Sequence, residues 1–266
     1  MEGIDVAGVD LPTVDWAEVA RSGRAFAFAR GCYKMTPDRG FAQYWPAIKN
    51  AGLVRGAYLF WDPRLDPLQV TARFLDTVGP LGPGDFPPTI DVEFPNGLAA
   101  TGVAAGQAIR NLQATVQAFE TRLRVPPIIY TSRRVWSGDL GNPQNTGLGR
   151  CPLWVPRYSP LDPQCPDEWG PGNWWIHQYA GDVTNAPGVQ GKTDLDRFNL
   201  LKEGDSGPRV AFVQNKLLLP PNGTFDESVL EAVQAFQGAN GLRVDGVVGP
   251  LTWSYLVWES ANPLAA

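Results

Sequence analysis

Two carboxylates, Asp91 and Glu93, occur in a pattern that could carry out acid–base chemistry. Polar and apolar residues alternate in the run Thr89-Ile90-Asp91-Val92-Glu93-Phe94. The period of two of a β-strand places both acids on one face, roughly 6.5 Å apart at Cβ from two rises of ~3.3 Å. Two carboxyls this close cannot both ionise freely, so one keeps its proton towards neutral pH. Such a pair suits glycoside hydrolysis, which needs a general acid and an anion or nucleophile.

The pattern alone leaves a structural alternative open, because an edge strand with one face in water alternates in the same way. The flanking residues favour the catalytic interpretation. Pro87-Pro88 precedes the strand and Phe94-Pro95-Asn96-Gly97 follows it, so the acids lie at its carboxyl end. In an eight-stranded βα barrel, that end is where active sites form.

The elements that would position these acids follow from the rhythm of the chain up to about Asn199. Short apolar runs alternate with helical stretches there, which is typical of βα units. Eight strands are expected, at residues 4–6, 25–30, 56–61, 89–94, 128–131, 153–155, 174–178 and 195–198. Crossover helices are expected with the first five strands, four of them at 15–22, 41–51, 67–78 and 101–123, and the later connections are loops rich in Gly, Pro and Asn. The sequence predicts an α/β fold, a closed parallel barrel whose later helices are replaced by loops.

Two more acids stand at strand ends in this scheme. Asp5 ends the first strand and Asp194 opens the last. A closed barrel would seat them on the same rim as Asp91 and Glu93. Four carboxyls in one pocket would cost stability, which favours a catalytic role. A metal site is the alternative, but nothing in the spacing favours one.

Composition excludes several classes of function. With 22 Lys and Arg against 27 Asp and Glu, the net charge is −5, and neither nucleic acid nor an anionic membrane is an expected partner. The single histidine, His177, excludes zinc hydrolases that take several imidazoles from their own chain. His177 is expected to fill a strand or orient groove residues, with a thiol-peptidase dyad as the weaker alternative. Three cysteines allow one disulfide at most, Cys151 with Cys165 being the better-placed pair, although free thiols are equally consistent.

The chain changes character after residue 199. A polar junction begins at Leu200, and three short helices are expected beyond it, at 210–218, 227–237 and 250–258. The sequence therefore predicts two domains, a barrel over residues 1–199 and a small three-helix all-α domain over residues 200–266.

The barrel region resembles the family 25 glycoside hydrolases, the Chalaropsis-type lysozymes or N-acetylmuramidases. Seven motifs occur in the order expected of that family: Gly3-Ile4-Asp5-Val6, Ala25-Phe26-Ala27-Phe28-Ala29-Arg30, Gly56-Ala57-Tyr58-Leu59-Phe60, Ile90-Asp91-Val92-Glu93, Leu153-Trp154-Val155-Pro156-Arg157-Tyr158, Trp175-Ile176-His177-Gln178-Tyr179 and Asp194-Leu195-Asp196-Arg197-Phe198. The resemblance implies an irregular (β/α)5(β)3 TIM-like barrel. It also implies cleavage, with retention, of the β-1,4 bond between N-acetylmuramic acid and N-acetylglucosamine, without a cofactor or metal.

The resemblance assigns roles to particular positions. Glu93 would be the general acid, and Asp91 would be the nucleophile or would steer the substrate's 2-acetamido group. Asp5 and Asp194 would complete the acidic cluster. The groove would be lined by Tyr58, Trp154, Tyr158, Gln178 and Tyr179. The chain departs from the family pattern at Leu59, where members often carry His, and at Pro156-Arg157.

The tail resembles the three-helix peptidoglycan-binding domain of type 1. The resemblance rests on Gly204-Asp205-Ser206-Gly207-Pro208, Ala232-Val233-Gln234-Ala235-Phe236-Gln237 and Asp245-Gly246-Val247-Val248-Gly249-Pro250. It implies a monomeric wall-cutting enzyme tethered to its substrate, bacterial peptidoglycan. The N-terminus shows no secretory leader, which would suit a phage endolysin acting on the cell wall. The alternatives are an inactive wall-binding protein and a chitin-directed N-acetylglucosaminidase.

Overall fold

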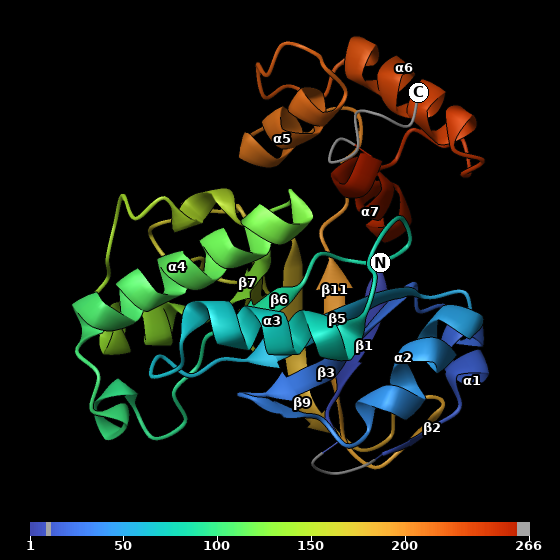
Figure 1. The fold of residues 1–266 in the computed structure, drawn as a ribbon. Coiled ribbons are helices and arrows are strands. Elements are labelled where there is room, and N and C mark those ends of the chain that lie inside the picture. The colour runs from blue at the N-terminus through green and yellow to red at the C-terminus, as the bar shows by residue number, and fades with distance from the viewer. Residues whose placement is uncertain (9–11, 260–266) are drawn as a thin grey trace.

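A closed barrel of eight strands forms the main body of the protein (Figure 1). The computed structural model describes residues 1–8 and 12–259. Strand β1 pairs with both β3 and β11, which closes the sheet. In barrel order, the strands are β1 (Glu2–Val6), β3 (Phe26–Tyr33), β5 (Val54–Phe60), β6 (Thr89–Asp91), β7 (Ile128–Tyr130), β8 (Leu153–Pro156), β9 (Ile176–Val183) and β11 (Thr193–Phe198). All eight expected strands are present, and the α/β barrel prediction is confirmed.

Helices cover the outside of the first half of the barrel only. They are α1 (Trp16–Arg21), α2 (Phe41–Asn50), α3 (Pro67–Val78) and α4 (Ala105–Leu123), and they follow β1, β3, β5 and β6 in turn. Helix α4 begins later than expected, because a 3₁₀ turn, η1 (Leu98–Thr101), ends at Gly102 in the left-handed conformation. The crossover from β7 to β8 holds a π-helical turn, η2 (Val135–Asp139), and a 3₁₀ turn, η3 (Leu148–Arg150), and the connections after β8 are loops apart from the short strand β10.

The remaining short strands lie at the margins of the barrel. Strand β4 (Thr36–Pro37) forms a hairpin with the end of β3, and β2 (Thr13–Val14) pairs with β10 (Val189–Gln190) in a separate two-stranded sheet. These pairings tie down the loops that surround the carboxyl rim.

The last strand corrects the prediction of a wholly parallel barrel. Strand β11 is antiparallel to both of its neighbours, β1 and β9. Only nine residues separate the end of β9 at Val183 from the start of β11 at Thr193, which is too short for a parallel crossover. The reversal puts the first residues of β11 at the carboxyl end of β1, so Asp5 and Asp194 are direct register partners. A parallel last strand would have sent Asp194 to the opposite rim.

A disulfide between Cys151 and Cys165 is absent, because all three cysteines are free and buried. Burial raises the pKa of the Cys151 thiol to about 12 and that of Cys165 to about 11. Of the two alternatives that the sequence leaves open, the structure has free thiols, and the loops around these residues are held by apolar packing and hydrogen bonds. One such bond joins Trp169 Nε1 to the Cys151 carbonyl at 2.8 Å.

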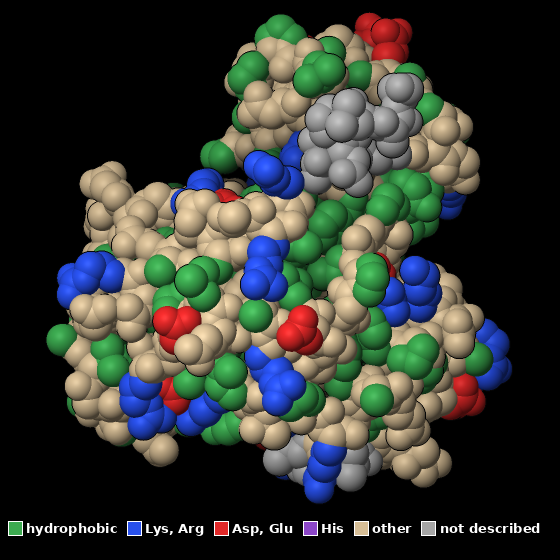
Figure 2. All heavy atoms as spheres, viewed as in Figure 1, with side chains coloured by type: hydrophobic (Ala, Val, Ile, Leu, Met, Phe, Trp, Pro, Cys, Tyr) green, Lys and Arg blue, Asp and Glu red, His purple; other side chains and the backbone are tan. Residues whose placement is uncertain are grey.

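The C-terminal helices sit over the amino-terminal end of the barrel (Figure 1). They are α5 (Pro208–Lys216), α6 (Glu227–Ala239) and α7 (Pro250–Glu259), close to the three expected. The Trp258 indole donates to the Asp85 carbonyl at 2.7 Å, and the Gly84 amide donates to Ser254 Oγ at 3.1 Å. Figure 2 shows hydrophobic side chains gathered at this junction. The helical region is therefore packed against the end of the barrel that lies away from the carboxyl rim.

No helix within the described ranges is long and apolar enough to cross a membrane.

Candidate active site

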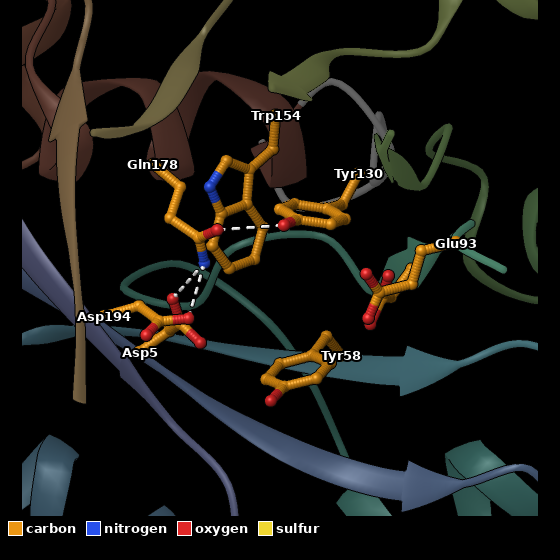
Figure 3. Close-up of a pocket in the computed structure, with 8 residues that line it drawn as sticks. Asp5, Tyr58, Glu93, Tyr130, Trp154, Gln178 and Asp194 are labelled. Atoms are coloured by element: carbon orange, nitrogen blue, oxygen red, sulfur yellow. Dashed lines mark hydrogen bonds between the residues drawn. The ribbon is translucent and has the colours of Figure 1, made fainter. Parts of the chain in front are cut away.

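A cavity of about 70 Å³ opens at the carboxyl rim of the barrel. Its lining comes from seven of the eight barrel strands or the residues that follow them (Figure 3). The lining residues are Asp5, Tyr58, Asp91, Glu93, Tyr130, Trp154, Gln178 and Asp194. The structure thus brings together all four acids expected at the site. The sequence predicted that Glu93 lies within the strand. Strand β6 ends at Asp91, so Glu93 lies just beyond it.

Gln178 holds the two acids contributed by β1 and β11. Its Nε2 donates to Asp5 Oδ2 at 2.8 Å and to Asp194 Oδ2 at 3.0 Å (Figure 3). Its Oε1 accepts from the Tyr130 hydroxyl at 2.9 Å. Because ionised carboxylates only accept hydrogen bonds, they fix the orientation of the amide, and its N–H groups offset part of their mutual repulsion.

Burial raises the pKa of three of the carboxyls in this cavity, those of Asp5, Asp91 and Glu93. Asp5 and Asp91 are 6% and 5% exposed, and desolvation raises the pKa of each well above its ordinary value. Neighbouring charge adds to this, from Asp194 on Asp5 and from Glu93 on Asp91. The pKa of Glu93 is also raised, first by burial and then by Asp194. Proton donors are therefore available in the cavity towards neutral pH.

Asp91 and Glu93 differ in what surrounds them. The buried Oδ1 of Asp91 has no hydrogen-bond partner among the described residues, so it is an acceptor that a bound molecule could satisfy. Glu93 lines this cavity and two others, one on each side of it. It therefore stands where three hollows of the rim meet.

Two residues of the site were missed by the sequence interpretation. Asp196 is fully buried, and its Oδ1 accepts from Trp154 Nε1 at 2.9 Å. Burial, with Asp5 and Asp194 nearby, raises the Asp196 pKa well above its ordinary value. Its signal was present, because the period of two that pairs Asp91 with Glu93 also pairs Asp194 with Asp196. Tyr130, the other omission, ends the fifth barrel strand, where an aromatic residue reaches the rim.

Replacing Asp196 by Leu is expected to destabilise the barrel by about 1–3 kcal/mol, because the buried Trp154 indole would lose its acceptor. Asp196→Asn keeps an oxygen acceptor of the same size and is expected to retain most of that stability. Urea unfolding followed by circular dichroism measures both. Equal losses in the two variants would contradict a hydrogen-bonding role for Asp196.

Of the residues expected to line the groove, some line the cavity, one lines a neighbouring hollow and one lies elsewhere. Tyr58 and Trp154 line the cavity beside Gln178. Tyr158 is 67% exposed and lines the neighbouring hollow with Glu93, and its hydroxyl lies 3.4 Å from Gln178 Oε1. Tyr179 does not line the cavity, because it follows Gln178 and its side chain leaves the strand on the other face. Its hydroxyl bonds to Glu2 Oε2 instead.

His177 has a structural position. It is fully buried, with Nε2 2.7 Å from the Arg157 carbonyl, while Nδ1 accepts from Arg197 Nε at 3.0 Å. Both ring nitrogens are therefore engaged, and neither bonds to a cysteine. Because burial also raises the pKa of all three thiols, a thiol-peptidase dyad finds no support.

Comparison with known families decides the identity of the barrel. The model of glycosyl hydrolases family 25 matches residues 4–189, which is more than half of the chain. This chain belongs to glycosyl hydrolase family 25. A second model, that of peptidoglycan binding domain 1, matches residues 206–256. The two matches identify a family 25 glycoside hydrolase of the lysozyme type that acts on peptidoglycan.

Relatives of this family 25 protein agree with the assignment. Lysozyme M1 of Streptomyces globisporus is 29% identical over 210 residues, covering 75% of this chain and 68% of its own. The crystal structure of a bacterial lysozyme from Streptomyces coelicolor superimposes with a TM-score of 0.68 at 25% identity, covering 75% of this chain and 92% of that one. The muramidase from Acremonium alcalophilum gives 0.66 at 25% identity, covering 75% and 93%.

Proposed function

We propose that this family 25 protein is an N-acetylmuramidase that cleaves the β-1,4 bond between N-acetylmuramic acid and N-acetylglucosamine with retention of configuration. The observation that carries the proposal is the position of Glu93, which lines three adjoining hollows of the rim and has a raised pKa. A sugar chain that crosses these hollows would pass its bridging oxygen in front of a carboxylic acid. Glu93 is the proposed general acid for that oxygen.

Asp91 is the proposed partner of Glu93. Its buried, unpartnered Oδ1 suits either of two roles, attack on the anomeric carbon or acceptance of the N–H of the 2-acetamido group, whose oxygen then attacks. Either role forms an intermediate on the face of the sugar opposite the leaving group, and water then attacks from the other face, so the anomeric carbon is inverted twice. Retention follows from both. The hydrogen bonds from Gln178 to Asp5 and Asp194 favour ionisation within this pair, and a carboxylate formed there would stabilise the oxocarbenium-like transition state.

The division of labour along the chain is part of the proposal. Residues 1–199 would carry the catalysis, with Tyr58, Trp154 and Tyr158 beside the sugars. Residues 200–266 would hold the enzyme on the cell wall, which raises the local concentration of glycan at the rim. The packed junction between the two parts supports a fixed anchor on the side away from the active site.

Analysis of digestion products tests the proposed bond. Purified cell wall is incubated with the protein, reduced with borohydride and examined by mass spectrometry, and new muramitol ends are expected. Reduced glucosamine ends would mean that the other glycosidic bond is cut, and free stem peptides without new reducing ends would contradict glycoside hydrolysis. Proton NMR during a short digestion should show the β-anomer of the new reducing end first, and the α-anomer first would rule out retention.

A further inference from the structure

A second cavity, of about 240 Å³, opens directly beside Glu93. Its walls come from the segments that follow β3, β5 and β6, and they include Tyr33, Lys34, Asp62 and Arg64. Glu93 lines this cavity as well as the catalytic one. A group attached to a sugar that is bound in front of Glu93 therefore has this cavity as its neighbour.

When Glu93 is protonated, the charged side chains that line this cavity sum to a positive charge. Asp62, whose side chain is 5% exposed, accepts from Arg64 Nη2 at 2.5 Å and pairs with Lys34 Nζ at 3.0 Å. The hydrogen bonds from Arg64, followed by those from Lys34, hold the pKa of Asp62 well below its usual range. Two cations thus face one permanent carboxylate. The other acid in the lining is Glu93, which is neutral when it is ready to donate its proton.

Lys34 adopts a strained backbone conformation at the edge of this cavity. Its φ of 58° lies in the left-handed region, which is strained for an L-residue other than Gly. Its amide donates to the Phe60 carbonyl at 2.9 Å, which fixes the turn against β5. Glycine would adopt this turn without strain, so the turn by itself gives no reason for a lysine.

An exposed aromatic surface adjoins the cations. The Tyr33 ring is stacked on Phe60 with centroids 4.7 Å apart, yet Tyr33 remains 42% exposed. Lys34 Nζ lies 5.1 Å from the centre of the same ring. The cavity thus offers an apolar wall and an excess of positive charge side by side, whereas the catalytic cavity next to it is lined by four acids.

We propose that this cavity binds the carboxylate-bearing stem peptide that the muramic acid residue carries on its lactyl group. The proposal rests on the proposed muramidase activity and adds a specificity to it. Neutral sugars need no cations beside them, and a polymer of N-acetylglucosamine has no carboxylate to offer. A peptidoglycan strand is neutral at its glycosidic bonds and anionic in its peptides, which matches an acidic cavity flanked by a cationic one. Lys34 and Arg64 would contact the peptide carboxylates, and Tyr33 would pack against peptide methyl groups.

Two forms of one substrate test the proposal. Soluble, uncrosslinked peptidoglycan strands are used either untreated or after their peptide carboxylates have been converted to amides with carbodiimide and ammonia. The full-length protein is expected to show a kcat/KM about five- to tenfold lower on the amidated strands, the loss of one partly exposed charge-assisted contact. Lys34→Asn removes the cation and keeps a residue that tolerates positive φ. Its kcat/KM should be about five- to tenfold lower on untreated strands and nearly equal on the two forms.

Matched variants separate recognition from damage to the fold. Arg64→Gln, at a half-exposed side chain, should act in the same direction as Lys34→Asn. Lys49→Gln, an exposed lysine at the end of α2, should keep the wild-type preference. The proposal would be overturned if the wild type had the same kcat/KM on untreated and amidated strands. It would also be overturned if Lys34→Asn lowered kcat/KM by the same factor on both forms, because the preference for untreated strands would then not depend on Lys34. If the wild type releases no muramic acid ends from either form, the muramidase proposal itself fails, which is a different result.

Discussion

Replacement of Glu93 by Gln is expected to lower the rate of glycan hydrolysis by about 10³-fold, within the range measured for general acids in other enzymes. The amide has nearly the same shape as the protonated acid, but it cannot give a proton to the leaving oxygen. The measurement is the release of new reducing ends from purified cell wall. Glu18→Gln makes the same chemical change at an exposed site in the first turn of α1 and should retain activity within about twofold.

The same variant should not lose stability. Glu93 is a partly buried carboxyl whose charged form is disfavoured by burial and by Asp194, so a neutral amide relieves repulsion. The thermal midpoint of Glu93→Gln is expected to equal or exceed that of the wild type. A variant that is inactive because it unfolds, or one that is fully active, would contradict the role of Glu93.

The direction of the Glu93 shift also fixes one limb of the pH profile. The acid must be protonated to act, and its pKa lies above the ordinary value of 4.5. Activity should therefore persist above that pH and fall as the pH rises through the raised pKa. In Glu93→Gln, the residual activity should lack this limb, because the titrating group is gone. A limb that persists unchanged would belong to another carboxyl of the cluster.

The acid pair was predictable from the sequence because its signal is local. The alternation over residues 89–94 pointed to Asp91 and Glu93 as a pair, and both line the cavity although β6 ends at Asp91; the same alternation would have pointed to Asp196. The sequence correctly predicted that Asp5 lies beside Asp194, but it did not predict the strand direction that brings them together. Their juxtaposition depends on β11 running antiparallel, which in turn depends on where β9 ends, and strand ends are set by sheet pairing and not by the local sequence.

The cationic cavity and the domain junction were beyond sequence reasoning. Lys34, Asp62 and Arg64 come from the loops that follow β3 and β5, and they meet because these two strands are neighbours in the sheet and because of how the loops fold beyond it. Similarly, the pattern of α7 correctly indicates that Trp253 is buried, but a helical pattern does not say against what. The rings that Trp253 contacts, such as that of Phe86, lie far from it in the sequence, and such non-local contacts leave no periodic signal.

One aromatic cluster joins the barrel to the helical region. Trp253 is fully buried, with ring centroids 5.0 Å from Trp175, 5.6 Å from Phe86 and 5.9 Å from Phe198. These three partners belong to the barrel and its adjoining loops, while Phe212 of α5 lies 6.4 Å away on the other side. The centre of the junction is therefore a single apolar core shared by both parts, and the helical region covers the amino-terminal end of the barrel.

Replacement of Trp253 by Ala is expected to lower the free energy of unfolding by about 3–5 kcal/mol, the usual loss for a large buried aromatic side chain. Because the cluster is shared, the loss should lower the midpoint of the barrel as well as that of the helices, in urea unfolding followed by circular dichroism. Trp253→Phe should keep much of the stability, and Leu251→Ala, at a 44% exposed side chain on the same helix, should cost little. Separate transitions, with the barrel midpoint unchanged in Trp253→Ala, would show instead that the helical region is an independent unit that contributes nothing to the stability of the barrel.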